Sequence, residues 1–398
     1  MTDRILYLHR TRGRSVEGVH IRSVAGALRE LGFVVDILSP PGVDPEASEP
    51  VAGKSKQGVL GRVPGAVATG APEWLFELVE LLYNVMSVWR LAGYLRRHQN
   101  VWIYERYSLF LWTTVWLARR RGIPVVLEVN DSAVMPRVRP LLMQRLARRI
   151  ERWVFNHCDG LVFVSTAFRD QVLAAHGSLA ATIISPNAAD SRRFDPAQHD
   201  RSAIRSRLGI EGKLVCGYLG AFAEWHGIHK FIDEMAPQLA AHPNLLLLLV
   251  GDGKTRPRVE QALDRHGVRH QAVLTGNVAH HQVAELIAAM DISVLPDSNT
   301  YGSPMKLFEL MSMGVPVVAP DYGPVAEVIK DGRTGWLFPQ GDMQRCLEVM
   351  LSLGANDIHA VGRAAREYII GERQWTNNAA QLVELYRVIV APRQEKLA

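Results

Sequence analysis

The sequence has few of the residues that build metal and redox sites. Its three cysteines, Cys158, Cys216 and Cys346, are widely separated and lack the spacing of a zinc or thiol redox motif. No Asp-x-Asp occurs, and the adjacent His280 and His281 would diverge on either a helix or a strand. We therefore expect no metal and no cofactor, and thiols kept reduced in a cytoplasmic environment.

Long hydrophobic runs are also missing. The first apolar run, Ile5–Leu8, is too short for a signal peptide. The segment Trp74–Leu95 is interrupted by charged and amide side chains at Glu77, Glu80, Asn84 and Arg90. Its apolar positions keep helical spacing, which indicates an amphipathic helix rather than a membrane span. Such a helix packs against a protein core more often than it lies on a bilayer.

The net charge of +5 is modest, but arginines are concentrated in the first half of the chain. They are Arg96, Arg97, Arg119–Arg121, Arg137, Arg139, Arg145, Arg148, Arg149 and Arg152. The sequence contains no zinc finger, RNA-binding signature or interleaved aromatic stripe, so we do not expect nucleic acid as a partner. A solvated face is the default interpretation, and peripheral contact with the inner face of a membrane is the functional alternative.

Short β-branched runs alternate with longer helical patterns, which is typical of parallel α/β sheets. Two series of five predicted strands are present. The first comprises 4–8, 34–39, 102–104, 125–129 and 161–165, and the second 214–219, 245–250, 272–275, 292–295 and 315–319. The pattern predicts two Rossmann-like doubly wound domains, and at 398 residues the chain is long enough for both.

We place the domain boundary in the polar stretch 187–200, giving domains 1–195 and 196–375. Trp375 and the spaced residues Leu382, Leu385 and Tyr386 predict a terminal amphipathic helix. Residues 40–72 are rich in glycine, proline and small side chains and predict a long loop in the first domain.

The segment Ser303–Ala319 suggests an anion site. Ser303 is a good N-cap and Pro304 suits the first helical position, so we expect the helix to begin at Ser303. Lys306 would then lie in the first turn, against the positive end of the helix dipole, which favours a bound anion there. Glu309 follows as a carboxylate able to accept two ribose hydroxyls. The segment suggests a nucleoside diphosphate site, and a plain surface helix with a misplaced lysine is the alternative.

Glycines follow several predicted strands of the second half. They are Gly220, Gly251, Gly253 and Gly276, the last followed by Asn277 and Val278. Ligands of doubly wound sheets bind beyond the carboxyl ends of strands, and glycine there lets backbone amides approach a ligand. Each glycine is also compatible with an ordinary tight turn.

Taken in order, these segments resemble the retaining glycosyltransferases of family 4, which have the two-domain GT-B architecture with an interdomain cleft. The resemblance runs almost end to end, and it implies that the C-terminal helix, 376–398, crosses back and belongs with the first domain. It rests on Val16–Ile21, Tyr104–Tyr107, Leu127–Asn130, Val164-Ser165, Ser185–Ala188, Gly220, Trp225–Gly227, Gly251–Gly253, Asp291–Pro296 and Ser303–Val318.

The resemblance implies roles for residues of the second domain. Glu309 corresponds to the glutamate that holds the ribose, and the backbone of Met305–Leu307, including Lys306, would cap the diphosphate. The family has a pair of glutamates at this site, and Glu309 matches the second of them. The position of the first is occupied by Tyr301, and Asp297 could take over its role. Many members of the family have two basic residues that neutralise the diphosphate. This chain has Ala221 and His226 at those two positions. We expect His226 to be partly protonated near neutral pH and to share the phosphate with Lys306; a solvated loop histidine is the alternative.

Residues of the first domain are candidates for acceptor binding. Gly18 and His20 lie at the opening helix, where a plain helix start is the alternative for Gly18. Glu105 and Arg106 follow a strand and could bind the acceptor or pair with each other. Glu128 points from a buried strand, so it must be paired or functional. Asn130 occupies the place of the family's donor-contacting histidine, with Asp131 beside it.

The sequence therefore predicts a metal-independent glycosyltransferase. It would move a sugar, with retention, from a UDP- or GDP-sugar to a saccharide or lipid-linked acceptor in cell-surface polysaccharide or glycolipid synthesis. Lys306, His226 and Asn130 would be catalytic. Two alternatives are an epimerase of the same architecture and a catalytically silent sugar-nucleotide-binding partner, the latter because Tyr301 and Ala221 stand at positions where charge is expected.

Overall fold

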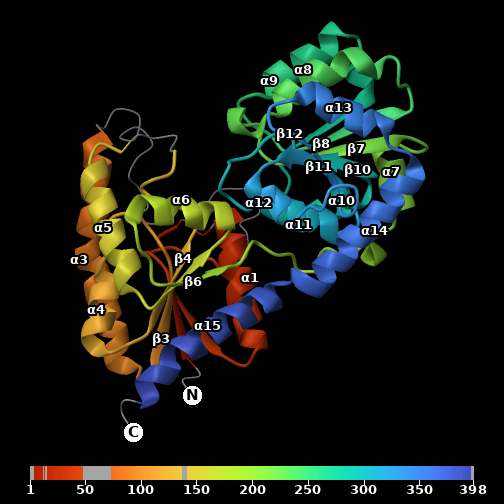
Figure 1. The fold of residues 1–398 in the computed structure, drawn as a ribbon. Helices are drawn as coiled ribbons and strands as arrows, with labels where there is room; N and C mark the ends of the chain where they lie inside the picture. Colours follow the sequence, from red (N-terminus) through yellow and green to blue (C-terminus); the bar gives the residue numbers. More distant parts are fainter. Residues whose placement is uncertain (1–3, 12, 14–15, 48–72, 137–140, 396–398) are drawn as a thin grey trace. The chain divides into compact units, whose positions relative to one another are not determined.

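The computed structural model describes residues 4–11, 13, 16–47, 73–136 and 141–395 (Figure 1). Most of the predicted loop at 40–72 therefore lies outside the described residues. The chain divides into two compact units. Unit 1 comprises Met1–Ser185 and Thr376–Ala398, and unit 2 comprises Pro186–Trp375.

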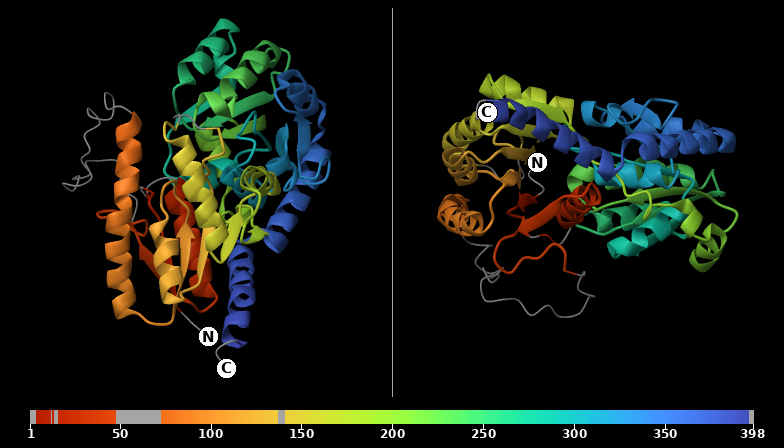
Figure 2. Two further views of the ribbon diagram at one scale, coloured as in Figure 1. Left: turned by 60° about the vertical axis from the view of Figure 1, so that its left-hand side comes forward. Right: turned by 90° about the horizontal axis from the view of Figure 1, so that it is seen from below.

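Unit 1 is built on a parallel sheet of six strands in the order β2-β1-β3-β4-β5-β6. The strands are β1 (Arg4–Leu8), β2 (Val34–Leu38), β3 (Val101–Arg106), β4 (Val125–Val129), β5 (Gly160–Phe163) and β6 (Ala181–Ile184). The helices are α1 (Val16–Glu30), α3 (Glu73–Arg97), α4 (Thr113–Arg121), α5 (Gln144–His157), α6 (Thr166–His176) and α15 (Trp375–Glu395). Helices α3, α4 and α5 lie side by side on one flank of the sheet (Figures 1 and 2).

The terminal helix α15 packs on the sheet of unit 1. Tyr386 stacks on Trp102 of β3, with ring centroids 4.4 Å apart. Gly160 of β5 lies against the same helix, where an added Cβ would be 2.9 Å from Ile389 Cδ1 and 3.1 Å from Leu385 Cδ2. The lack of a side chain at Gly160 therefore lets α15 approach the strand closely.

Unit 2 has a second parallel sheet of six strands, in the order β12-β11-β10-β7-β8-β9. The strands are β7 (Leu214–Leu219), β8 (Leu245–Val250), β9 (Ala272–Gly276), β10 (Ile292–Val294), β11 (Val317–Asp321) and β12 (Trp336–Pro339). The helices are α7 (Arg201–Leu208), α8 (Ile228–Leu239), α9 (Arg256–Arg265), α10 (His280–Ala288), α11 (Met305–Ser312), α12 (Gly323–Ala326), α13 (Met343–Ser352) and α14 (Ala355–Glu372).

The predicted fold class is confirmed, and each predicted strand matches an observed one. Two edge strands were missed, β6 and β12. Both are short and only partly buried, so they lack the continuous apolar run that marks central strands.

Residues 186–195 belong to unit 2 rather than to a free linker. Phe194 is only 2% exposed in the core of that unit, and its carbonyl accepts a hydrogen bond from Ser312 Oγ at 2.9 Å. Ala189 bridges to Gln374. The boundary therefore falls at Ser185/Pro186, ten residues before the predicted position of 195/196.

None of the described helices is long and apolar enough to cross a membrane.

Strand order locates the ligand-binding edge of each sheet. In unit 2 the chain runs outward from β7 through β8 to β9, then returns to β10 on the other side of β7. In unit 1 the same reversal occurs between β1 and β3. Loops leave in opposite directions at such a switch point and open a crevice at the carboxyl ends of the strands. The residues after β7 and β10, and after β1 and β3, are therefore the first to inspect.

Candidate functional site

In unit 2 the switch point brings Lys306 and His226 together. His226 ends a short 3₁₀ turn, Glu224–His226, beyond β7, and Lys306 comes from the first turn of α11 beyond β10. Lys306 Nζ lies 3.1 Å from His226 Nδ1 and 5.2 Å from the centroid of the Tyr218 ring. Gly220 has φ +144°, and a Cβ there would come within 2.7 Å of Lys306 Nζ. Glycine at 220 therefore leaves the space that the ammonium occupies.

The electrostatics of this pair correct the predicted charge state of His226. Burial, reinforced by Lys306, lowers the pKa of His226 to about 3, so the imidazole is neutral at pH 7. Burial also lowers the pKa of Lys306 to about 7, although the negative charge of Glu309 raises it. When Lys306 is protonated, its ammonium donates to His226 Nδ1, which places the imidazole proton on Nε2. The expectation of a partly protonated His226 near neutral pH is therefore wrong.

The start of α11 also differs from the prediction. The helix begins at Met305, with Pro304 as the N-cap residue and no side-chain cap. Ser303 does not cap the helix, because its Oγ accepts a hydrogen bond from the backbone N–H of Asn187 at 3.0 Å. The side-chain amide of Asn187 donates to the Ser303 carbonyl as well. Asn187 thus fixes the loop that leads into α11, while Lys306 stays in the first turn of the helix.

Glu309, in the second turn of α11, has a partner that the sequence did not suggest. His280, the first residue of α10, places Nε2 2.9 Å from Glu309 Oε1. The carboxylate is buried, with 8% of its side chain exposed. His280 Nδ1 is buried without a hydrogen-bond partner among the described residues. This contact fixes the orientation of the Glu309 carboxylate.

The glycines after β8 serve loop packing. Gly251 has φ +133°, and a Cβ there would lie 2.0 Å from the Gly220 carbonyl oxygen. At Gly253, with φ +156°, a Cβ would lie 2.6 Å from Phe222 O. Their amides are already engaged: Gly251 N donates to Gly276 O, and Gly253 N to Asp252 Oδ1. The interpretation that these two amides reach toward a ligand is therefore not supported; both glycines let the loops pack backbone to backbone.

The remaining predicted donor residues lie in neighbouring loops. Asn277 is exposed, while Val278 and Tyr301 are partly buried. Asp297, in the loop after β10, packs against the turn at Gly227, where a Cβ would come within 2.9 Å of Asp297 Cβ. Asp297 is thus adjacent in space to the turn that carries His226.

In unit 1, Glu128 is the centre of a buried polar cluster. Its carboxylate accepts from Arg106 at 2.9 Å and from Tyr7 Oη at 2.8 Å, and His20 Nε2 lies 3.3 Å away. Asn130 also donates to Glu128. Burial alone would raise the pKa of Glu128, but His20, Arg106 and the hydrogen bonds hold it below its ordinary value. Of the two alternatives, paired or functional, Glu128 is paired.

Glu105 and Arg106 do not pair with each other, which was one of the two interpretations of their sequence. They alternate along β3, so their side chains leave opposite faces, and Arg106 binds Glu128 instead. Glu105 is 1% exposed, and its Oε2 has no partner among the described residues. Burial raises the pKa of Glu105 to about 7. Glu105 is therefore a buried carboxyl poised between its two charge states.

Two further features shape this edge of unit 1. Gly18 lies so close to the preceding loop that a Cβ would be 2.2 Å from the Gly13 carbonyl oxygen, so it does more than start a helix. Asp131 follows β4 in a loop held by the buried Glu151, which accepts from Ser132 Oγ at 2.6 Å and Ala133 N at 2.8 Å. Within the described part of the chain, no group of three or more potential ligands could hold a metal ion.

Comparison with known proteins agrees with this architecture. The family model for glycosyltransferase family 4 matches residues 18–193, and the model for glycosyl transferases group 1 matches residues 213–356. The chain belongs to the family 4 glycosyltransferases. Among solved structures, this glycosyltransferase resembles HepE of Anabaena crystallised with UDP, with a TM-score of 0.70 at 17% identity over 97% of this chain and 100% of that one. That likeness confirms the GT-B fold.

Two curated relatives are similar in sequence. A GDP-mannose-dependent alpha-mannosyltransferase of Mycobacterium tuberculosis is 28% identical over 286 residues, 71% of each chain. An alpha-D-kanosaminyltransferase of Streptomyces kanamyceticus is 24% identical over 229 residues, which is 56% of this chain and 59% of the relative.

Several residues of the site were missed from the sequence. The sequence raises His280 only as a metal ligand, and it assigns no role to Tyr218, Tyr7 or Asn187. Each contacts its partner across a large separation in sequence, as His280 does with Glu309 and Asn187 with Ser303. Only Asn187 carried a signal, since it lies within a motif shared with the family.

Proposed function

We propose that this glycosyltransferase moves a sugar, with retention of configuration, from a UDP- or GDP-sugar to a hydroxyl of a saccharide or lipid-linked acceptor. The observation that carries the proposal is the contact between Lys306 and His226 at the switch point of unit 2. Burying an ammonium is costly, and a bound anion offsets that cost. The printed names of the relatives, which include a GDP-mannose-dependent enzyme, support a nucleotide-sugar donor.

The chain's own residues suggest how the diphosphate is held. The first amides of α11, the Lys306 ammonium and the Nε2 proton of His226 would bind its oxygens. Glu309, oriented by His280, would accept hydrogen bonds from ribose hydroxyls. The bond between the anomeric carbon and the diphosphate oxygen breaks, and the acceptor oxygen bonds to the same face of that carbon. The acceptor proton passes to the departing diphosphate, whose growing charge Lys306 and His226 stabilise.

Residues of unit 1 would bind the acceptor. We assign Asp131, Gly18, His20, Glu105 and Arg106 to this role, and Asn130 to contact with the donor sugar at the reacting carbon. Arg106, His20 and Asn130 are tied to Glu128, so they form a rigid group rather than independent side chains. No metal takes part in the proposed reaction, and transfer should therefore persist in excess EDTA.

Donor binding is expected to take up a proton above neutral pH. With a pKa of about 7, Lys306 is largely neutral at pH 8 in the free protein, and a bound diphosphate would raise that pKa. Nucleoside diphosphate binding should then take up close to one proton at pH 8 and almost none at pH 6. Affinity should fall by about tenfold per pH unit above pH 7. Calorimetry in buffers of different ionisation enthalpy measures this uptake.

The matched control for this prediction is Lys306→Arg, because a guanidinium stays charged throughout the range. The variant should show no proton uptake at pH 8. Equal uptake by the variant and the wild type would assign the titration to another group.

Removal of His280 should weaken nucleotide binding without affecting folding. His280→Ala frees the Glu309 carboxylate, so we expect about tenfold weaker binding of the nucleoside diphosphate, on the order of 1.4 kcal/mol. His281→Ala is the matched control, since His281 is adjacent and exposed. Equal affinity of the two variants would show that His280 does not position Glu309.

The function is tested by incubating the protein with UDP- and GDP-sugars, with and without saccharide acceptors. NMR of the product gives the anomeric configuration. Transfer with retention supports the proposal. An inverted product, or an epimerised donor formed without acceptor, would contradict it. Neither transfer nor donor hydrolysis, despite nucleotide binding, would indicate a silent binding partner.

A further inference from the structure

Between Trp74 and Trp89, helix α3 exposes an apolar stripe and buries polar side chains. Five apolar residues follow helical spacing along one exposed face: Trp74, Leu78, Leu82, Val85 and Trp89. Leu82, Val85 and Trp89 are 60%, 72% and 73% exposed. An ordinary surface helix has the opposite arrangement, with its apolar stripe toward the core. Isolated exposed apolar side chains need no explanation, but a continuous stripe on one helix does.

Hydrogen bonds from the buried polar side chains of α3 explain why its apolar stripe faces outward. Glu77 accepts hydrogen bonds from Leu142 N at 2.6 Å and Met143 N at 2.7 Å, just before α5. Asn84 Oδ1 accepts from Trp112 N at 3.1 Å and Thr113 N at 3.3 Å, at the start of α4.

The amides bound by Glu77 and Asn84 lie at helix starts, where backbone N–H groups lack partners within the helix. The polar contacts therefore fix the orientation of α3 and commit its apolar stripe to the surface of unit 1.

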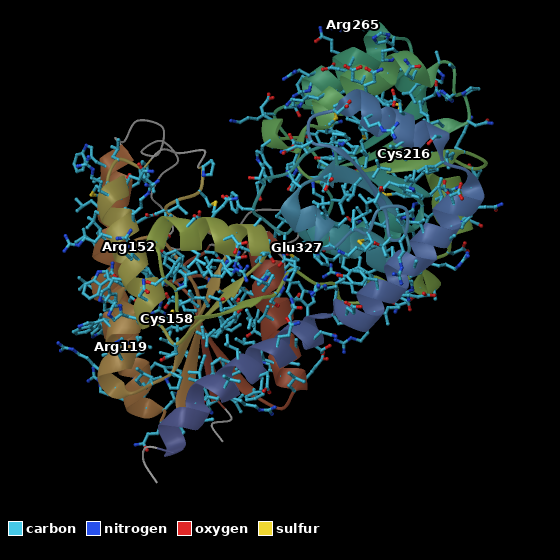
Figure 3. All side chains as sticks on the ribbon, viewed as in Figure 1. Arg119, Arg152, Cys158, Cys216, Arg265 and Glu327 are labelled. Carbon is cyan, nitrogen blue, oxygen red and sulfur yellow. The ribbon has the colours of Figure 1, made fainter. Side chains whose placement is uncertain are left out.

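Exposed arginines lie on α3 itself and on the neighbouring helices α4 and α5. The last turn of α3 carries Arg96 and Arg97, the last turn of α4 carries Arg119–Arg121, and α5 carries Arg145, Arg148, Arg149 and Arg152. Figure 3 labels Arg119 and Arg152 on these two helices. The carboxylates described on α3 to α5 do not offset them. Glu77 and Glu151 are buried and engaged with protein groups, and Glu80 pairs with Arg10 at 3.0 Å.

We propose that the α3 stripe and the arginines of α3, α4 and α5 form a docking surface for an anionic phospholipid bilayer. A helix with a wide apolar stripe and flanking arginines binds in the plane of a bilayer, with the apolar side chains among the acyl chains and the cations at the headgroups. Trp74 and Trp89, near the two ends of the stripe, are of the type enriched at that boundary. The stripe spans roughly 22 Å along the helix, at 1.5 Å per residue.

Charge favours a bilayer over a second copy of the chain. Two copies that met through this face would bring two sets of exposed arginines together, with few free carboxylates on the same helices to offset the repulsion. An anionic headgroup layer satisfies both the apolar stripe and the arginines. This inference concerns unit 1 alone and does not depend on the proposed sugar transfer.

The test is flotation of the full chain with vesicles of phosphatidylcholine alone and of phosphatidylcholine mixed with phosphatidylglycerol. We expect binding to be at least about tenfold stronger with phosphatidylglycerol and to weaken in high salt. L82Q/V85Q/W89Q should abolish binding. The matched control is I370Q/V388Q, which removes exposed apolar side chains from α14 and α15.

Charge is tested separately with R148Q/R149Q, which should reduce the preference for anionic vesicles, against R265Q/R363Q on helices of unit 2. Circular dichroism confirms that each variant folds. The proposal is overturned if the wild type binds neither kind of vesicle or if the α3 variant binds as well as its control. It is also overturned if the stripe instead mediates a dimer, seen by light scattering as a mass that the α3 variant halves.

Discussion

Replacing Lys306 by alanine is expected to lower kcat/KM for sugar transfer by about 10² to 10³, the typical cost of removing one group that stabilises developing charge. The Lys306 ammonium contacts His226 Nδ1 and the Tyr218 ring, in the space that the missing side chain of Gly220 leaves open. The charge on the diphosphate grows as the glycosidic bond breaks, so the loss should appear in kcat as well as in KM. Steady-state kinetics with a nucleotide-sugar and a saccharide acceptor measures both.

The matched control for that prediction is Lys230→Ala. Lys230 lies on α8, is exposed, and is four residues from His226 in sequence. Its removal should change kcat/KM by less than about twofold, because an exposed charge at the surface is screened by water and salt. Equal losses in the two variants would show that general positive charge, rather than the placed ammonium, assists the reaction.

Glu128→Ala is expected to destabilise unit 1 by about 3 to 5 kcal/mol, the range for removing one partner of a buried ion pair. The substitution leaves the Arg106 guanidinium without its carboxylate and removes the acceptor for Tyr7 and Asn130. A loss of this size approaches the total stability of many domains, so the variant should unfold at much lower denaturant concentration. Urea denaturation followed by circular dichroism measures the shift.

Two comparisons make the Glu128 result specific. Glu128→Gln keeps the shape and one acceptor oxygen and should cost less than Glu128→Ala. Glu384→Ala removes an exposed carboxylate 3.5 Å from Arg387 and should cost less than about 1 kcal/mol.

Because the folded pKa of Glu128 is lowered, its contribution is present above the ordinary value of 4.5 and is lost as pH falls through the folded value. Equal stability of Glu128→Ala and the wild type at neutral pH would contradict this account of the cluster.

The fold could be predicted because its central strands are marked strongly in the sequence. Runs such as Leu245–Val250 are wholly buried, so they consist of apolar residues without alternation. The edge strands β6 and β12 have partly exposed residues and no such run. The boundary near Ser185 was misplaced because the polar stretch after it looks like a linker, while Phe194 within it is a core residue.

The site was predictable where chemistry is local in sequence. Lys306 and Glu309 fall in the first and second turns of one helix, so their placement followed from a single segment. The partner of Glu309 comes from α10, 29 residues away, and the sequence offers no rule that brings His280 to it. The predicted charge state of His226 was also wrong. The pKa of His226 depends on burial and on Lys306, and neither can be read from a loop sequence. The Ser303 cap failed for a similar reason, since Asn187 engages its hydroxyl.

The central claim is that unit 2 binds a nucleoside diphosphate at Lys306, His226 and Glu309. The most direct measurement is a thermal-shift panel of UDP, GDP, ADP and their sugars with the wild type, Lys306→Ala and Glu309→Ala. A ligand at a hundred times its dissociation constant stabilises the folded protein by about 2.7 kcal/mol. We predict that UDP or GDP raises the melting temperature of the wild type and that both substitutions remove most of the increase. No shift with any nucleotide, or an undiminished shift in both variants, would contradict the account.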